Sequence, residues 1–208
     1  MEFLLKQINK DLYSAEFEIL ENDKVVGKIS LQGKLGSMEA SLDGSFYDKS
    51  FKLDFVNKFL SGNDLKFRPY YIIENDNIIG EIYQTCFKKS ILSESYYTKC
   101  IYEQKDYTSY SIGLGEKSVT TVYCNEVQIS EIHKDGIVYN DLYIFELYAD
   151  NREDAYITVL DAIYGYILGC YEPGIKVSKS VSKHYNKTTD KYLISKYDPE
   201  WIKNIKNE

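Results

Sequence analysis

The chain has 208 residues, of which 44% are hydrophobic and 15% aromatic, so it can bury a core and is not an intrinsically disordered chain. Its formal net charge is −7, which excludes the basic surface that generic nucleic-acid binding requires. Tyrosine, with 21 copies, favours strands and half-buried positions. We expect one folded domain with an appendage and no nucleic-acid partner.

The charge is unevenly distributed along the chain. From Cys170 onward there are eight lysines and five acids, so the preceding residues carry the whole acidic excess. Pro173 and Gly174 mark a break at the start of this basic segment. The sequence therefore predicts a domain over residues 1–170 and a basic C-terminal extension over residues 171–208 that packs on it and complements its charge. Contact with an anionic membrane or with a partner protein is the alternative role for this extension.

Residues 13–19 alternate between apolar and polar side chains, the pattern of a half-buried strand. A polar turn at residues 21–24 and a second alternating run over residues 25–32 complete a β-hairpin. Residues 70–82 repeat residues 17–29 closely, and residues 124–132 form a weaker third copy. The copies share an Asn in the turn and then a Val or Ile followed by a small residue: Asn22, Val26, Gly27; Asn75, Ile79, Gly80; Asn125, Ile129, Ser130. Three hairpins about 50 residues apart indicate a repeated β unit, with chance as the alternative for the third copy.

Further strands are predicted between and after these hairpins. Asp43-Gly44 and Asp135-Gly136 are predicted turns, and the run at 142–149 is apolar on both faces apart from Glu146, as in a strand buried from both sides. The predicted strands cover residues 38–42, 51–55, 96–103, 107–114, 119–124 and 142–149. In total we expect about 10–12 strands.

The period changes to that of a helix over residues 150–170. Asp150 is the predicted N-cap, with Glu153 three residues later as in a capping box. The helix is apolar on nearly every side except for a narrow stripe formed by Thr158, Asp161 and Gly165. Asp161 is expected to make a structural hydrogen bond, with a ligand-facing role as the alternative.

A helix that is apolar all round must be buried all round, and its apolar part, about 21 Å long, is too short to cross a bilayer. We therefore expect a mainly β (α+β) fold: a closed antiparallel β-barrel around one central apolar helix near residues 151–169, plus the C-terminal appendage. Closure would also remove the open strand edges of the sheet. Gly165 and Gly169 are expected to permit close backbone approach to the helix.

The repeated hairpins, the strand "DLYIFELYAD" and the helix "AYITVLDAIYGYI" resemble the tubby C-terminal-like superfamily, and within it the LURP-one-related group, over roughly residues 1–170. The resemblance implies a closed barrel threaded by an apolar helix, and docking to lipid or to a membrane surface. The chain departs from the family in continuing past the helix and in its acidic barrel region, where Arg68 and Arg152 are the only arginines. No lipid-binding residue is therefore carried over from the family, and the membrane anchor and clustered cysteines of the related scramblases are not visible.

Within the extension, residues 176–187 are expected to form a weak amphipathic helix or an irregular arm, and residues 191–197 a short strand. A final helix is predicted with Asp198 as N-cap and Pro199 at its first position. Its apolar face would carry Trp201, Ile202 and Ile205.

No catalytic, cofactor-binding or metal-binding residue is predicted, and the ligand-binding residues are left open. His133 and His184 belong to no ligand pattern, and "GLGEKS" at residues 113–118 lacks the order of a phosphate loop and is expected to be a turn. The acids Glu74 and Asp76 are expected to be solvated. The cysteines lack a CxxC spacing and are expected to be reduced structural thiols: Cys86, Cys100, Cys124 and Cys170.

We interpret the chain as a non-enzymatic cytoplasmic binding module, without export signal or transmembrane segment, peripheral at the membrane if it docks on anionic lipid. The alternative is a structural or regulatory protein-interaction domain, for example a homodimer formed through tyrosine-rich strands. An unrecognised enzyme is a third hypothesis, which requires a pocket with a perturbed acid or nucleophile. The oligomeric state is not predicted.

Overall fold

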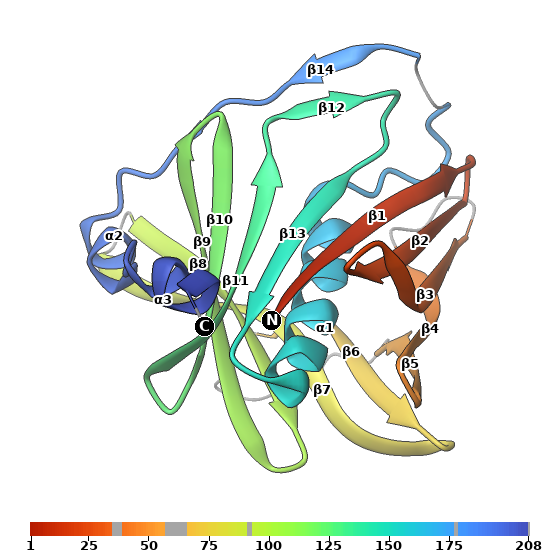
Figure 1. Ribbon diagram of the computed structural model, residues 1–208, viewed down its shortest axis with the longest axis horizontal. Coiled ribbons are helices and arrows are strands. Elements are labelled where there is room, and N and C mark those ends of the chain that lie inside the picture. Colours follow the sequence, from red (N-terminus) through yellow and green to blue (C-terminus); the bar gives the residue numbers. More distant parts are fainter. Residues whose placement is uncertain (35–38, 57–65, 91–92, 177–178, 208) are drawn as a thin grey trace.

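The computed structural model describes residues 1–34, 39–56, 66–90, 93–176 and 179–207. Within them, twelve strands form one closed antiparallel barrel, and a helix runs through its interior (Figure 1). The strands are β1 (Glu2–Lys10), β2 (Ser14–Glu21), β3 (Lys24–Gly33), β4 (Ala40–Phe46), β5 (Lys49–Phe55), β6 (Phe67–Glu74), β7 (Asn77–Ser90), β8 (Ser93–Tyr102), β9 (Lys105–Gly115), β10 (Lys117–Cys124), β11 (Val127–Asp135) and β13 (Ile144–Ala149).

Neighbours in the sequence are neighbours in the barrel for nearly all of its circumference. Strands β1 to β11 follow one another in order, and β13 joins β11 to β1. Each strand therefore has a partner on both sides, and the barrel has no free edge. This confirms the predicted closed antiparallel barrel, and the strand number lies within the predicted range.

The three predicted hairpins are confirmed, and each turns on two residues in the left-handed conformation. The turns are Asn22-Asp23, Asn75-Asp76 and Asn125-Glu126, with φ between 48° and 65°. A two-residue turn with positive φ at both positions matches the twist of the flanking strands. Glu103-Gln104 makes a fourth such turn between β8 and β9, which the repeat did not reveal because it lacks the Asn.

A β-bulge explains the rest of the repeated motif. Val26, Ile79 and Ile129 are the extra residues, left without a partner where the register shifts. The carbonyl of each extra residue accepts a backbone N–H from beyond the next strand: from Tyr47 (2.7 Å), Glu103 (3.2 Å) and Asp150 (3.2 Å), respectively.

The small residue after the bulge makes room for this contact in the first two copies. A Cβ on Gly27 would lie 2.4 Å from the carbonyl oxygen of Ser45, and one on Gly80 would lie 2.2 Å from that of Ile101. Both distances are too short for any side chain. The repeated motif therefore links the two strands of a hairpin to a third strand, and its residues have a structural role.

The central helix α1 (Arg152–Gly169) is buried on nearly all sides, with Leu160 and Ile163 each 0% exposed. Its N-cap is Asn151, whose side chain accepts the N–H of Asp154 at 3.0 Å; the prediction of Asp150 as N-cap was wrong by one residue. The amide of Asp150 is instead engaged by the bulge at β11.

Three tyrosines attach α1 to different parts of the wall. The Tyr156 hydroxyl donates to Glu74 at 2.6 Å, the Tyr164 hydroxyl donates to the Arg68 carbonyl at 3.0 Å, and the Tyr166 hydroxyl accepts from the Gln7 amide at 3.1 Å. Since each buried hydroxyl finds a partner, the aromatic rings can fill the core without leaving polar atoms unsatisfied. Glu74 is thus a core partner, and the expectation that it is merely solvated was wrong.

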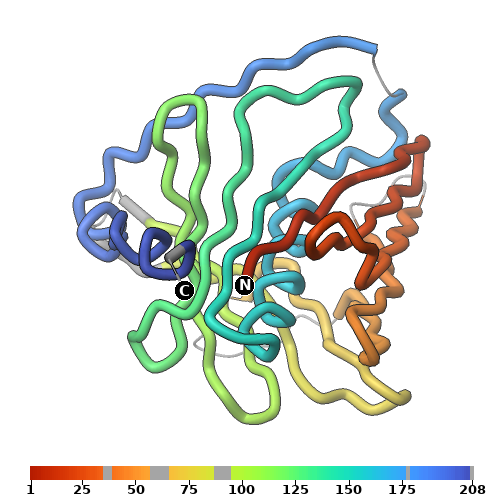
Figure 2. Tube along the Cα trace, in the orientation of Figure 1, coloured from red at the N-terminus to blue at the C-terminus, as the bar shows by residue number. Residues whose placement is uncertain are grey.

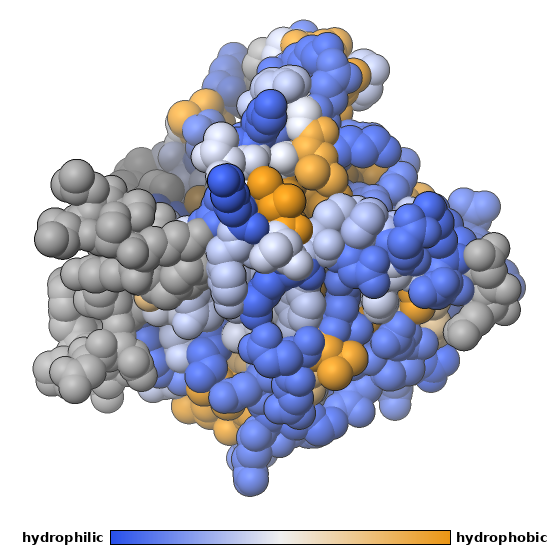
Figure 3. Space-filling model, turned by 90° about the vertical axis from the view of Figure 1, so that its left-hand side faces the viewer, coloured by the Kyte–Doolittle hydropathy of each residue, from blue (hydrophilic) through white to orange (hydrophobic). Residues whose placement is uncertain are grey.

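The C-terminal extension runs across one end of the barrel and then down its outer wall (Figure 2). It forms β14 (Val181–Lys183), β15 (Asn186–Lys187), α2 (Lys191–Lys196) and α3 (Trp201–Asn207). Strand β14 pairs with β12 (Ile137–Tyr139), an excursion between β11 and β13, and β15 pairs with β9. The side of the molecule that α2 occupies is mainly hydrophilic, with apolar side chains in small separate groups (Figure 3).

Several local predictions were wrong. Residues 191–197 contain the helix α2 instead of a strand, because the Asp190 side chain caps the N–H groups of Tyr192 and Leu193. Asp43-Gly44 lies inside β4 and Asp135-Gly136 bends the chain from β11 into β12 without closing a hairpin. The predicted final helix is present as α3, and Asp198 accepts the N–H of Glu200 at 2.9 Å, as expected of the predicted N-cap, although the helix itself begins at Trp201.

Candidate functional site: a polar cavity beside the central helix

The inner face of β8–β10 turns polar toward the C-terminal end of α1. Ser109 is paired with Thr98 on one side and Val122 on the other, and paired residues of neighbouring strands share a face. The Ser109 hydroxyl donates to Asp161 of α1, so this shared face points inward. The same face includes further hydroxyl side chains: Ser111, Ser118 and Thr120.

The stripe on α1 faces these hydroxyls and leaves a cavity of about 330 Å³. Asp161, Gly165 and Gly169 all line it. A Cβ built on either glycine would meet no atom within 4 Å. The expectation that these glycines permit close backbone approach was therefore wrong: they leave space, and Gly165 is exposed although it belongs to a central helix.

Asp161 lies at the inner end of this cavity and is only 6% exposed. Its Oδ1 accepts the Ser109 hydroxyl at 2.8 Å, and the described residues supply no donor to Oδ2. Burial raises the pKa of Asp161 to about 6, and the Ser109 hydrogen bond opposes that rise only partly. The carboxylate is thus held in a costly environment with part of its hydrogen-bonding capacity unused.

The opposite charge lies at the mouth of the cavity, near the end of α1. Lys134 of β11 lines the cavity, with its Nζ 3.6 Å from the Cys170 Sγ and 5.7 Å from the centre of the Tyr143 ring. Burial raises the pKa of the Cys170 thiol, and the nearby Lys134 ammonium works in the other direction. Among the described residues that line the cavity, Asp161 and Lys134 are the only ones that carry a formal charge at neutral pH.

The C-terminal extension closes one side of this cavity. Asn186 of β15 lines it, and a Cβ on Gly113 would lie 2.6 Å from the Asn186 backbone. The Gly113 N–H donates to Thr188 Oγ1 at 2.6 Å, and Gly113 accepts from the Thr188 N–H at 3.1 Å. Residues 113–118, which were predicted to be a turn, are the end of β9, a tight turn and the start of β10, and the extension docks there.

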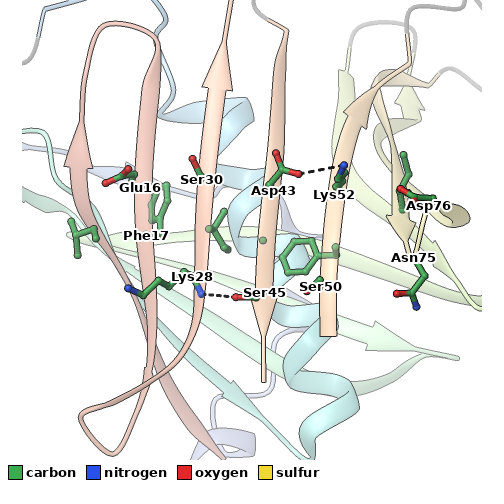
Figure 4. A pocket seen from close by; sticks show the side chains of 15 residues that line it. Glu16, Phe17, Lys28, Ser30, Asp43, Ser45, Ser50, Lys52, Asn75 and Asp76 are labelled. Carbon is green, nitrogen blue, oxygen red and sulfur yellow. Dashed lines mark hydrogen bonds and ion pairs between the residues drawn. The ribbon is translucent and has the colours of Figure 1, made fainter. Parts of the chain in front are cut away.

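A larger depression of about 630 Å³ lies on the outside of β2–β6 (Figure 4). Its charged side chains project from the solvated face of the sheet, and Lys52 pairs with Asp43 at 3.8 Å while Lys28 pairs with Glu18 at 3.5 Å. The charged residues of its lining, Glu16, Lys28, Asp43, Lys52 and Asp76, are all exposed to solvent. The depression thus has no buried charged group among its described residues that a ligand would complete, and the interior cavity is the stronger candidate.

The remaining residues singled out by the sequence lie elsewhere. His133 points to the outside of the barrel, where its Nε2 lies 2.7 Å from Oε2 of the fully buried Glu131, and the backbone N–H of His184 donates to Gly136 in the extension's docking contact. The four cysteines are free thiols, in agreement with the sequence. No group of three or more potential metal ligands occurs within the described part of the chain, and no helix there is long and apolar enough to cross a membrane.

Comparison with known proteins identifies no relative of this chain. No family model matches it, and neither a curated protein nor a solved structure does. The resemblance to the tubby C-terminal-like superfamily and its LURP-one-related group therefore stays a prediction from the sequence, and the function must be argued from the site itself.

Proposed function

We propose that the protein is a binding module that holds a small polar molecule in the cavity between α1 and β8–β11. The observation that carries this proposal is the polar lining at this point, where Ser109, Ser111 and Thr120 face Asp161 and the two glycines of α1, Gly165 and Gly169. A barrel built only for stability would fill this space with apolar side chains, as it does around the rest of α1. The cost of the unfilled, polar space is explained by a ligand that completes it.

The lining favours a small polar ligand over a lipid chain. Hydroxyl groups of β8–β10 and the Asp161 carboxylate of α1 face the cavity. A polar ligand can form hydrogen bonds with these groups, whereas an acyl chain would leave them without partners. The volume of about 330 Å³ is at the lower end of the range of small-molecule sites.

The described lining has one group of the kind that the enzyme hypothesis requires, Asp161, whose pKa is raised by burial. Beyond this acid, the lining favours binding over turnover. It contains no histidine, and its single cysteine, Cys170, has a raised pKa that keeps the thiol protonated and weakly nucleophilic. Ser109 donates its hydroxyl to Asp161, which is a structural hydrogen bond as well as a contact with the cavity.

Native mass spectrometry of freshly purified protein tests the proposal, with Gly165→Leu as the matched variant. The new side chain has open space in front of it, so it is expected to fill the cavity without disturbing the fold. We expect a small-molecule adduct on the natural chain and its loss in the variant. Retention of the same adduct by a folded Gly165→Leu protein would contradict binding in this cavity, as would failure of the natural chain to retain any adduct or to bind polar fragments.

A second candidate function, docking on anionic lipid, is favoured by the two-stranded ribbon β12–β14. Ile137 and Tyr139 of β12 are 39% and 61% exposed, and Val181 of β14 is 64% exposed. Tyr139 is paired with Val181 and Ile137 with Lys183, so these side chains share one face. Lys176 and Lys179 precede β14 in sequence, which gives the combination of exposed apolar and basic side chains that suits a membrane surface.

Cosedimentation with vesicles containing phosphatidylserine tests this second function. The double variant Tyr139→Ser, Val181→Ser is expected to lose retention at low salt, while the matched change of the exposed Val25 to Ser, on β3, leaves it unchanged. If the natural chain shows no retention, lipid docking is wrong. A defined oligomer in analytical sedimentation, abolished by the same double variant, would instead support the protein-interaction alternative.

A further inference from the structure

The inference that follows rests on the proposed function and names the chemistry of the ligand. We propose that the cavity binds a short aliphatic primary amine, with the ligand's ammonium group paired to Asp161 and its chain directed toward the mouth of the cavity.

The first support is the state of the Asp161 carboxylate. It is 6% exposed, it lines the cavity, and its Oδ2 receives no donor from the described residues. A largely buried carboxylate with a single hydroxyl donor from the protein is stabilised most by a partner that brings both a positive charge and hydrogen-bond donors. An ammonium group does both, since it carries three N–H donors.

The second support is the composition of the inner end of the cavity. Ser109 already donates to Asp161, and Thr98 lies beside it across the strand pair. Hydroxyl oxygens accept as well as donate, so they can receive the N–H groups that the carboxylate does not take. Lys134, the one cation of the described lining, lies near Cys170, nine residues further along the chain than Asp161. At about 1.5 Å per residue, Cys170 lies about 13 Å from Asp161 along the helix axis. Lys134 is also not among the groups that shift the pKa of Asp161, so it does not neutralise the carboxylate directly.

The third support is the wall between the two charges. Ile132, Phe145 and Ala162 supply apolar side chains to the same cavity. A ligand with an aliphatic chain can lie against them, and the distance to Lys134 suits an elongated molecule. Lys134 then favours ligands whose far end carries a carboxylate over those that end in a methyl group.

Four six-carbon compounds separate these contributions: hexylamine, 6-aminohexanoate, hexanoate and 1-hexanol. Calorimetric titration at pH 7.5 is expected to show binding of the two amines and at least about tenfold weaker binding of the other two. Asp161→Asn, which keeps the size of the side chain, is expected to weaken amine binding by about tenfold or more. Lys134→Met is expected to remove the advantage of 6-aminohexanoate over hexylamine.

The same titration at pH 5 provides a readout that a purely structural role of Asp161 would not give. Burial raises the pKa of Asp161 to about 6, so the carboxylate is largely protonated at pH 5 and amine affinity is expected to fall in the natural chain but not in Asp161→Asn. The other titratable groups around Asp161 among the described residues are the Cys100 thiol of β8, the Tyr107 hydroxyl of β9 and the Tyr164 hydroxyl of α1. Burial raises the pKa of all three, so they stay neutral over this range. Lys134 and Cys170 line the cavity further along α1.

Equal binding of 1-hexanol and hexylamine, or unchanged amine affinity in a folded Asp161→Asn protein, would overturn the assignment of the ammonium group. Binding of hexanoate or hexanol that is as tight as that of the amines and that Gly165→Leu abolishes would overturn it while leaving the proposed function intact. If none of the four compounds binds, the amine proposal is wrong, and the adduct experiment alone decides whether the cavity binds another class of molecule.

Discussion

Two parts of the barrel wall are built with opposite polarity. In β2–β5 the inward side chains are apolar, such as Phe17 and Leu42, and the outward ones are polar, such as Ser30 and Lys52. In β9–β10, near the end of α1, Ser109 and Thr120 point inward. The difference teaches that strict alternation identifies a strand but does not say which of its faces is the interior.

The outer face of the inverted part of the wall is apolar, and the extension covers it. Tyr110 and Tyr123 point outward, and Leu193 of α2 packs on them to form a small second core. Lys196 Nζ lies 5.0 Å from the centre of the Tyr110 ring and pairs with Glu126 at 2.7 Å. A cation over an aromatic ring and an ion pair add to the apolar contact. In β9–β10 the polar side chains point inward and line the cavity, while the tyrosines point outward and bind the extension. The same alternation of polar and apolar residues thus produces both features.

The largest expected effect is the loss of the fold on placing a charge where α1 is fully enclosed. Leu160 is 0% exposed, so Leu160→Asp would bury a carboxylate without a partner and is expected to destabilise the protein by about 5 kcal/mol or more. Leu160→Met, which conserves volume, is expected to cost less than about 1.5 kcal/mol. Chemical denaturation followed by circular dichroism measures both, and a cooperative Leu160→Asp protein would contradict the central position of α1.

The next largest effect is expected where a glycine contacts the backbone of a neighbouring strand, in contrast to a glycine that faces open space. In Gly27→Ala and Gly80→Ala the new methyl group would lie 2.4 Å and 2.2 Å from a carbonyl oxygen, and we expect a loss of about 3 kcal/mol in each. The matched control is Gly165→Ala, where nothing lies within 4 Å. Replacing a helix glycine by alanine is expected to stabilise by about 0.5–1 kcal/mol. Thermal unfolding measures all three, and a stable Gly80→Ala protein would show that the bulge can relax.

Much of the fold could be predicted from the sequence, because the signals involved are local. The Asn-Asp turns, the period of two and the change to an all-apolar helix follow from neighbouring residues alone. The cavity could not be predicted in the same way. Its hydroxyl lining comes from β8–β10 together with α1, and which face of β9 is inward depends on the distant helix α2.

Asp161 was the one residue of the site for which the sequence raised a ligand-facing role, as a polar position on an apolar helix. The signal that was missed is the row Ser109, Ser111 and Gly113 in alternation with Tyr110 and Ile112. From this alternation alone, one expects Tyr110 and Ile112 to point into the barrel. They can point outward because the C-terminal extension covers the outer face of these strands. Similarly, Gly165 and Gly169 were read as contacts because glycine serves close approach and open space equally well.

The third effect concerns the pH dependence of stability without ligand. Burial raises the pKa of Asp161 to about 6, so the folded state binds this proton more tightly than the unfolded state does. The cost of the ionised carboxylate is therefore fully present above pH 6, and it disappears as the pH falls below the unfolded value near 4. We expect Asp161→Asn to be more stable than the natural chain at pH 7, by less than about 3 kcal/mol, and this difference to shrink at pH 4.5.

Urea denaturation at both pH values measures this difference. A saturating amine ligand is expected to reduce it at pH 7, because the ammonium group removes the cost of the carboxylate. An Asp161→Asn protein that is less stable than the natural chain at pH 7 would mean that the Ser109 hydrogen bond outweighs the burial of the charge.

The smallest effect tests whether the two parts of the wall unfold together. Leu193→Ala removes the centre of the second core, whereas Ile194→Ala removes a side chain that is 46% exposed on the same helix. We expect Leu193→Ala to speed hydrogen exchange in residues 181–207 and at the outer positions of β9 and β10, with a change in global stability of about 1 kcal/mol, and Ile194→Ala to do neither. Because the barrel closes through β9–β10 without help from the extension, it is expected to stay folded when the extension opens. If Leu193→Ala instead lowers the stability of β2–β5 as much as that of β9, then the inverted wall and the apolar wall form one cooperative unit, and the extension belongs to the folding core.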